Sequence, residues 1–318
     1  AVYQCPEPTA EALLRARTVG LEGSHVDAIF YCTWCSGFGM FTHNTRIGEV
    51  FSAKSGIFRR NMAPELIAAG ADPLKVMVEW GHRHEIQVFW SMRINDVHDG
   101  AYPELFPRWK KEHPQFLMGE PRRRPSKIRD GRAWTAVDFT HSEVRERAFR
   151  FVEEVCQRYD VDGIELDFFR HPILFWRHAW QGQAGDEERD MLTRLMRRIR
   201  QMTEQRGLER GRPILVAVRV PDSPGYCRAI GIDIERWLRE GLIDLMIVGG
   251  YFRLRPWGKS VELGHRYGVP VYACLSESRI AGQAGAERRR AEAYRARAMD
   301  AWSQGADGIY LFNFNYIF

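Results

Sequence analysis

The stretch "VDGIELDFFRHP" at residues 161–172 alternates between two kinds of side chain. Its large apolar residues are Ile164, Leu166 and Phe168. The positions between them hold Gly163, Glu165 and Asp167. Because successive side chains of a strand point to opposite faces, the apolar set suits a helix layer and the acids face the other way. An unpaired buried charge is costly, so this strand needs charged partners or a wet cavity on its acidic face.

A short phrase recurs along the chain and indicates the architecture. Each copy places an aspartate before a run of β-prone residues: "VDAIF" (26–30), "VDGIEL" (161–166), "IDLMIV" (243–248) and "ADGIYL" (306–311). Each copy also follows a helical pattern, as expected where a helix leads into a parallel strand. We expect these aspartates to bond turns and loops at the strand starts.

Strands and helices alternate along the whole sequence. Besides the opening stretch, the predicted strands are residues 26–34, 85–93, 134–139, 214–220, 242–252, 269–277 and 307–314. This pattern predicts an α/β fold, a (β/α)8 TIM barrel that forms one domain over residues 1–318. The alternative is a doubly wound sheet, but no G-x-G-x-x-G loop follows an early strand. The last helix is expected to be either trimmed off or replaced by a helix at about residues 9–19.

Composition limits the partners of the chain. Of its 318 residues 45% are hydrophobic, but no apolar run is long enough to cross a membrane. The six cysteines are dispersed, and the Cys32–Cys35 pair has no second pair at metal-ligand spacing, so we predict packing roles and no metal or cofactor. The basic run "EPRRRPSKIRDGR" (120–132) is interpreted as a solvated loop, with an anion site as the alternative. No nucleic-acid-binding motif accompanies it.

The alternation of side chains places several charges in the barrel mouth. Asp167 is expected at the carboxyl end of its strand, where barrel active sites are built, and Glu165 one layer deeper. The same parity turns Arg93 and Arg219 inward from the strands at 85–93 and 214–220. The two acids are therefore expected to be paired with two arginines in a wet cavity.

Other polar and aromatic residues follow the predicted strand ends. The segment "RINDVHDG" (93–100) supplies an asparagine, an aspartate and a histidine, and "SESR" supplies Glu277. The predicted substrate-binding residues are Trp34, Arg93, Asn95, His98, Arg170, His171, Arg219, Asp222, Tyr251 and Asn313.

Two carboxylates across a cleft are the apparatus of glycoside hydrolysis. Asp167 fits the nucleophile or stabilising base, and Glu277 is the first choice for the general acid. Glu165, Asp96 and Asp222 are the rival carboxylates. The mouth arginines and the basic run favour an acidic or sulfated saccharide.

Two other functions remain open. A metal-dependent barrel hydrolase or lyase is conceivable with Asp167, Asp96, His98 and Glu277 as ligands. A catalytically silent carbohydrate-binding barrel is the third possibility. The sequence indicates no oligomeric state.

The sequence also resembles a known group of enzymes. "VDFTHSEVRERAFRFVEEVCQRYDVDGIELDFFRHP" (137–172), "FWSMRINDVHD" (89–99) and "GADGIYLFNF" (305–314) are similar to glycoside-hydrolase-like barrels related to glycosyl hydrolase family 10. The resemblance covers roughly residues 80–318 and implies a bacterial, carbohydrate-active TIM barrel with Asp167 as the essential carboxylate. It implies a periplasmic or secreted enzyme whose leader is absent from this chain, with the cytoplasm as the alternative.

Overall fold

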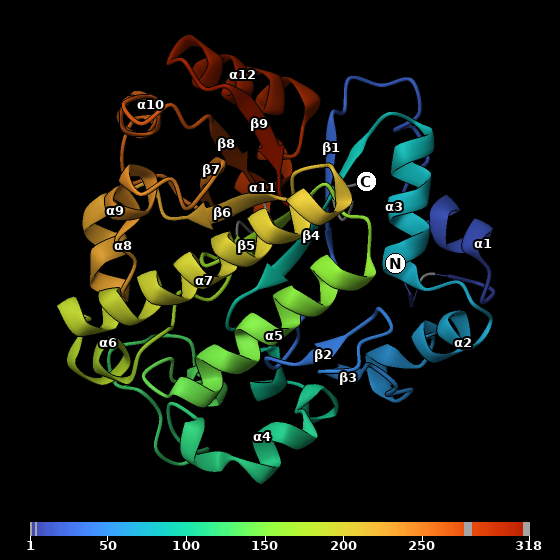
Figure 1. The fold of residues 1–318 in the computed structure, drawn as a ribbon, viewed down its shortest axis with the longest axis horizontal. Coiled ribbons are helices and arrows are strands. Elements are labelled where there is room, and N and C mark those ends of the chain that lie inside the picture. Colours follow the sequence, from blue (N-terminus) through green and yellow to red (C-terminus); the bar gives the residue numbers. More distant parts are fainter. Residues whose placement is uncertain (1, 4, 277–281, 314–318) are drawn as a thin grey trace.

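A seven-stranded sheet lies at the centre of the computed structural model, which describes residues 2–3, 5–276 and 282–313 (Figure 1). Every neighbouring pair of strands is parallel, and the order in the sheet is the order in the chain. The strands are β1 (Ala28–Cys32), β4 (Gln87–Arg93), β5 (Gly163–Asp167), β6 (Leu215–Val220), β7 (Leu245–Gly250), β8 (Val271–Leu275) and β9 (Gly308–Leu311). The predicted α/β barrel class is confirmed.

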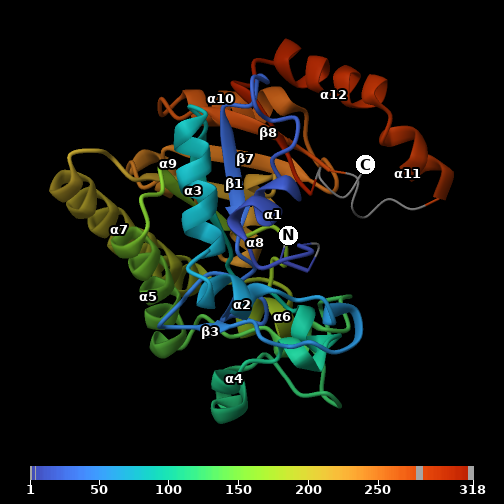
Figure 2. The same cartoon turned by 90° about the vertical axis from the view of Figure 1, so that its right-hand side faces the viewer.

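Helices cover the outer face of the sheet (Figures 1 and 2). Those of the barrel wall are α3 (Pro73–Arg83), α5 (Ser142–Arg158), α7 (Asp186–Arg210), α8 (Pro224–Ile230), α9 (Ile234–Arg239), α10 (Trp257–His265) and α12 (Ala291–Ser303). Helix α11 (Gly282–Arg288) contacts α12 and stands out at the side of the molecule (Figure 2). The remaining elements are α1 (Ala10–Arg15), α2 (Ala63–Ala68), α4 (Arg108–Glu112), α6 (Trp176–Gln181) and the strand pair β2 (Met40–Phe41) and β3 (Glu49–Val50). None of the described helices could cross a membrane.

The side chains divide between the two faces as the parity of the sequence predicts. Ile164, Leu166 and Phe168 are fully buried in the core between the sheet and the helices. A second core fills the inside of the barrel and is centred on Phe89, Ala217 and Tyr310. The acids of β5 lie on this inner side.

The predicted strand at residues 134–139 is wrong. Residues Ala133–Thr135 form a 3₁₀ turn instead, and β4 pairs directly with β5. The backbone of Val137 bonds to the side-chain amide of Asn95 in both directions, at 2.8 and 3.0 Å. Because this amide satisfies the backbone groups that a neighbouring strand would bind, the strand-prone residues need no place in the sheet.

The recurring aspartates bond the neighbouring strand at the amino ends of the sheet. The carboxylates of Asp162, Asp244 and Asp307 accept the backbone N–H of Val88, Val216 and Val271, each at 2.7 Å. The fourth copy, Asp27, precedes β1, and its carboxylate has no hydrogen-bond partner within residues 2–313 as far as these are described. The strand that would offer Asp27 a backbone N–H would lie on the side of β1 away from β4. Among the described residues, that side is the edge of the sheet.

The described residues leave the sheet open between β1 and β9. Helix α1 contacts α3 and shares a small core with α2, so it covers only one side of the place expected for a last helix. Leu21 and Met299, from the two sides of this opening, line the same cavity. Of the two alternatives expected for the last helix, the structure does not bear out replacement by the N-terminal helix, because α1 buries its apolar residues against α2 and α3.

Candidate active site

Asp167 ends β5 and lines a cavity of about 980 Å³. Its Oδ1 accepts the backbone N–H groups of Phe169 and Arg170, both at 2.9 Å. Its Oδ2 accepts a hydrogen bond from Nη2 of Arg219 at 2.6 Å. Three donors on one carboxylate stabilise its charged form and fix its orientation at the carboxyl end of the strand.

Arg219 is the cation that pairs with Asp167 inside the barrel. It comes from β6, directly opposite Asp167 in the register, and is fully buried. Burial acts to lower the pKa of its guanidinium, but the charge of Asp167 outweighs this effect and raises the pKa well above its ordinary value. The guanidinium carbon lies 3.9 Å from the centre of the Phe312 ring, which supports it from one side.

Glu165 lies one layer below Asp167 and is fully buried. Its Oε2 accepts a hydrogen bond from Tyr310 Oη at 3.2 Å, whereas its Oε1 is 3.9 Å from Nε of Arg219. Burial, and then the negative charge of Asp167, raises the pKa of Glu165 to about 7, against the opposing charge of Arg219. Arg219 is thus the shared cation of two carboxylates, and Glu165, the deeper of the two, is the one that binds a proton.

Replacing Glu165 by glutamine is expected to remove one contribution to the pH dependence of stability. The folded-state pKa of about 7 lies above the unfolded value, so the stabilising contribution of Glu165 is lost as the pH rises from about 4.5 to 7. The loss is about 3 kcal/mol over that window. Urea unfolding at pH 5, 6, 7 and 8 tests this expectation, with the exposed Glu79→Gln as the matched control. A stability difference between the wild type and Glu165→Gln that is the same at all four pH values would contradict it.

Asp96 forms a second buried ion pair beside the first. Its carboxylate accepts Nη1 of Arg93 at 3.2 Å, Oγ of Ser36 at 3.2 Å and the backbone N–H of His98 at 2.9 Å. Burial acts to raise the pKa of Asp96, but the hydrogen bond from His98 and the charge of Arg93 outweigh it and hold the pKa well below its ordinary value. Asp96 is therefore a fixed anion and a poor proton donor.

His98 is locked between Asp96 and Arg170. Its Nδ1 lies 2.7 Å from Asp96 Oδ2, and since a carboxylate can only accept, Nδ1 carries the proton. Its Nε2 lies 3.2 Å from Nη2 of Arg170, which can only donate. The network therefore assigns the neutral Nδ1–H tautomer to His98. Arg170 also donates to Tyr251 Oη at 3.0 Å, which ties the end of β5 to the segment after β7.

His171 completes a group of possible metal ligands. The side chains of Asp96, His98 and His171 each offer a ligand atom within 4.8 Å of the others. Burial holds the pKa of His171 well below its ordinary value, and neither of its ring nitrogens has a hydrogen-bond partner among the described residues. This donor set suits a transition metal, although Arg93 and Arg170 already bind two of its members.

Two residues predicted to bind substrate make structural hydrogen bonds. The amide of Asn95 donates to the backbone oxygens of Val137 and Ile173 and accepts the N–H of Val137. Asp222 is 2% exposed, and its Oδ2 accepts the N–H groups of two residues in the segment after β7, at 2.8 and 3.0 Å. Both sets of bonds hold loops in place, and the roles of Asn95 and Asp222 in substrate binding stay predictions.

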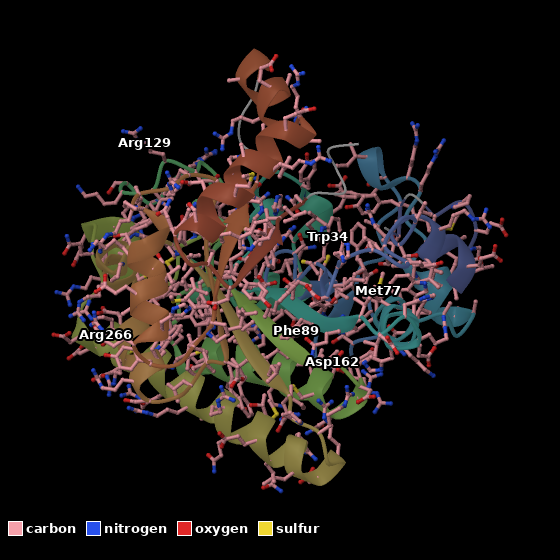
Figure 3. The ribbon with its side chains drawn as sticks, turned by 90° about the horizontal axis from the view of Figure 1, so that it is seen from above. Trp34, Met77, Phe89, Arg129, Asp162 and Arg266 are labelled. Atoms are coloured by element: carbon pink, nitrogen blue, oxygen red, sulfur yellow. The ribbon has the colours of Figure 1, made fainter. Side chains whose placement is uncertain are left out.

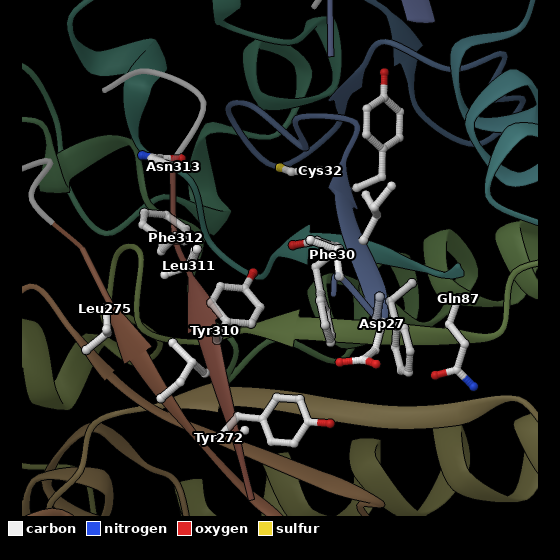
Figure 4. A pocket seen from close by; sticks show the side chains of 18 of the residues that line it. Asp27, Phe30, Cys32, Gln87, Tyr272, Leu275, Tyr310, Leu311, Phe312 and Asn313 are labelled. Carbon is white, nitrogen blue, oxygen red and sulfur yellow. The ribbon is translucent and has the colours of Figure 1, made fainter. Parts of the chain in front are cut away.

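The cavity runs from the mouth of the barrel into the opening between β1 and β9 (Figure 4). Trp34, Arg93 and Asn313 line its mouth beside Asp167. Trp34 has a φ of +89° and packs against Phe51, with ring centres 4.7 Å apart. Such a strained backbone at a non-glycine residue is typical of functional sites, and its ring is presented to the cavity.

Glu277, the predicted general acid, lies outside the described residues. Three further contributors were missed by the sequence reasoning: Tyr310, Phe312 and Ser36. The parity of β9 could have identified Tyr310 and Phe312, since both alternate with Leu311, whereas no local signal connects Ser36 with Asp96.

Comparisons with known proteins reach only the level of the fold. No family model matches the chain, and no curated protein matches its sequence. The chain is similar in structure to alpha-L-fucosidase isoenzyme 2 from Paenibacillus thiaminolyticus, with a TM-score of 0.57 and 15% identity over 96% of this chain. It spans 42% of the length of that fucosidase chain.

A second similar structure is the PgaB (BpsB) glycoside hydrolase domain from Bordetella bronchiseptica. The TM-score is 0.51, with 12% identity over 76% of this chain and 74% of that domain. Both similar structures are glycoside-hydrolase barrels, and neither comparison points to family 10 in particular. At these identities the likeness establishes a shared barrel fold and leaves the chemistry to the site itself.

Proposed function

We propose that this chain is a glycoside hydrolase that cleaves a poly- or oligosaccharide with two carboxylates. The observation that carries the proposal is Asp167, a carboxylate fixed by three donors at the carboxyl end of β5 and facing a large cavity. Barrel enzymes place their catalytic groups at this end of the strands. A periplasmic or secreted location is part of the same proposal.

In the proposed reaction the glycosidic C–O bond breaks while positive charge develops at the anomeric carbon. The carboxylate of Asp167 stabilises that charge, either by attacking the carbon or by activating a water molecule. Glu277 gives its proton to the leaving oxygen, and water supplies the hydroxyl group of the product. Glu165 is fully buried, so its proposed role is to tune Asp167 through their shared Arg219.

The test is turnover of a panel of aryl glycosides and oligosaccharides by the wild-type protein and by variants at Asp167 and Glu277. Loss of turnover in both, with better retention by Glu277→Gln on substrates with good leaving groups, is the expected pattern. A general acid matters less when the leaving group needs no proton. Failure of every glycoside to react would overturn the proposal.

The second candidate is a metal-dependent hydrolase, favoured by the convergence of Asp96, His98 and His171. The trio would hold a divalent ion as a Lewis acid. Its members, however, lie beside two arginines, and a bound cation would have to displace Arg93 from Asp96 and Arg170 from His98. The geometry therefore favours a metal-free mechanism.

Removal of metal is expected to leave activity unchanged to within about two-fold, because the charges of the site are balanced by arginines. The measurement compares glycosidase rates before and after dialysis against a chelator, with metal content determined by elemental analysis. Stoichiometric metal in the purified protein, together with activity that is lost on chelation and restored by that metal, would favour the second candidate.

A further inference from the structure

The basic run at residues 120–132 forms an anchored loop. Pro125 is buried, and Ile128 packs on a small core that includes Ala179 of α6. The backbone N–H of Lys127 donates to the carbonyl oxygen of Ala179 at 3.1 Å, and Glu120 and Arg123 bond each other through their backbones at 2.9 and 3.0 Å. These contacts fix the loop against α6.

The cations of this loop lack acidic partners. Arg122, Arg123, Arg124, Lys127 and Arg129 are exposed, and within the described residues none has a carboxylate oxygen within 4.0 Å of its charged nitrogens. Figure 3 shows Arg129 at the outer edge of the molecule. By contrast Arg132, at the end of the loop, pairs with Asp130 at 2.7 Å. A fixed array of like charges is unfavourable by itself and is relieved by a bound polyanion.

Two tryptophans of α6 lie beside these cations. Trp176 is 40% exposed and stacks on Trp180, with ring centres 6.0 Å apart and planes inclined by 26°. The guanidinium of Arg123 lies 5.3 Å from the centre of the Trp180 ring, and Trp180 Nε1 donates to the carbonyl oxygen of Met118 at 2.8 Å. The pair is therefore held rigidly and offers an apolar face to a ring that stacks on it.

A shallow hollow of about 480 Å³ adjoins the loop and α6. It is lined by Lys127, Arg177, Gln181, Gly182 and Gln183. Arg177 is only loosely neutralised, since its Nη1 is 3.8 Å from Glu188 Oε2. The two amides can bond hydroxyl groups while the cations bind acidic substituents.

We propose that the loop and α6 together form a binding surface for a polyanionic glycan chain, either sulfated or rich in uronic acid. This surface, the loop–α6 surface, consists of the five exposed loop cations, Arg177, Trp176, Trp180, Gln181 and Gln183. Stacked tryptophans bind the faces of sugar rings, the amides bind hydroxyl groups, and the cations bind the acidic groups. The choice of a glycan over a nucleic acid rests on the proposed function.

The structure connects this surface with the mouth of the barrel. The loop ends at Arg132, whose backbone and Cβ pack directly against Gly100, two residues after His98. Helix α6 follows β5 after only eight residues, on the side where Asp167 lies. In the mouth itself Arg93, Arg170 and Arg219 all have partners, so the unneutralised charge lies on the loop–α6 surface. The loop–α6 surface would therefore hold a bound glycan next to the proposed catalytic carboxylates.

The experiment measures binding by isothermal titration calorimetry at low and moderate salt. The probes are dextran sulfate, unsulfated dextran and an oligothymidylate of matched charge. The variants are the triple Arg122→Gln/Arg123→Gln/Arg124→Gln and the single Trp176→Ala. The control is the triple Arg83→Gln/Arg194→Gln/Arg239→Gln, which removes equal charge from exposed positions on α3, α7 and α9.

We expect dextran sulfate to bind at least about ten-fold more tightly than dextran, and less tightly as salt rises. The loop triple should weaken this binding about ten-fold or more and Trp176→Ala about five-fold or more, while the control triple changes it less than about two-fold. Equal weakening by both triples, or tighter binding of the oligothymidylate at the same residues, would overturn the proposal. Binding of dextran sulfate without turnover of any glycoside would overturn the proposed function and leave the surface intact.

Discussion

Asp167→Asn is expected to lower the kcat for glycoside hydrolysis by at least several hundred-fold, within the roughly 10²–10⁴-fold that such a positioned group contributes. Asparagine can still accept the backbone N–H groups that Oδ1 binds, so the loop after β5 keeps its shape. What the variant loses is the negative charge facing the anomeric carbon. The remaining counter-ion of Arg219 is then Glu165, which is 3.9 Å away and takes up the charge as the influence of Asp167 disappears.

The matched control is Asp186→Asn, which neutralises a highly exposed aspartate at the start of α7. It should leave kcat unchanged, and both proteins should show wild-type circular dichroism. The anomeric configuration of the first product released by the wild type separates the two possible roles: retention indicates that Asp167 is a nucleophile, whereas inversion favours activation of water. Undiminished turnover by a folded Asp167→Asn protein would remove Asp167 from the catalytic machinery.

The central part of the site could be predicted because it depends on strand parity. Once the stretch at 161–172 is placed in a barrel, the two-residue repeat of a strand directs Glu165 and Asp167 toward the inside. The same repeat places Arg219 on the inner face of the next strand. The ion pair at 2.6 Å then follows from adjacency in the sheet. The alternation of residues within β5 and the pairing of β5 with β6 place the same side chains on the inner face, so this stretch predicts the ion pair as well as the strand.

The loops could not be predicted in the same way, because their partners are distant in sequence. In the sequence, Asn95 is a polar residue at a predicted strand end. Only the structure shows that its side-chain amide is hydrogen-bonded to the backbones of Val137 and Ile173. The buried pair of Lys110 and Asp99, at 2.6 Å, is equally invisible from spacing. Side chains that replace missing strand neighbours leave no periodic signal, which is why the sequence predicts a strand at residues 134–139.

Arg219→Met is expected to destabilise the protein by about 3–5 kcal/mol, because it leaves two buried carboxylates without their cation. Both carboxylates are at most 3% exposed, so solvent cannot replace the guanidinium. The control is Arg198→Met on α7, which removes a half-exposed partner of Glu146 and should cost less than about 1 kcal/mol. Urea unfolding at pH 7 measures both variants.

The pH dependence of the Arg219→Met protein distinguishes lost charge pairing from lost packing. Without the guanidinium, whose charge lowers the pKa of Glu165, the folded-state pKa of Glu165 rises further above its unfolded value, so stability should recover as the pH is lowered from 7 toward 5. Adding Asp167→Asn should also restore part of the loss, since it removes one of the two stranded charges. If the single variant is equally unstable at pH 5 and 7 and the second substitution makes it worse, then Arg219 acts by filling space against Phe312. In that case the hydrogen bonds from the backbone N–H groups of Phe169 and Arg170, and not the charge of Arg219, would stabilise the Asp167 carboxylate.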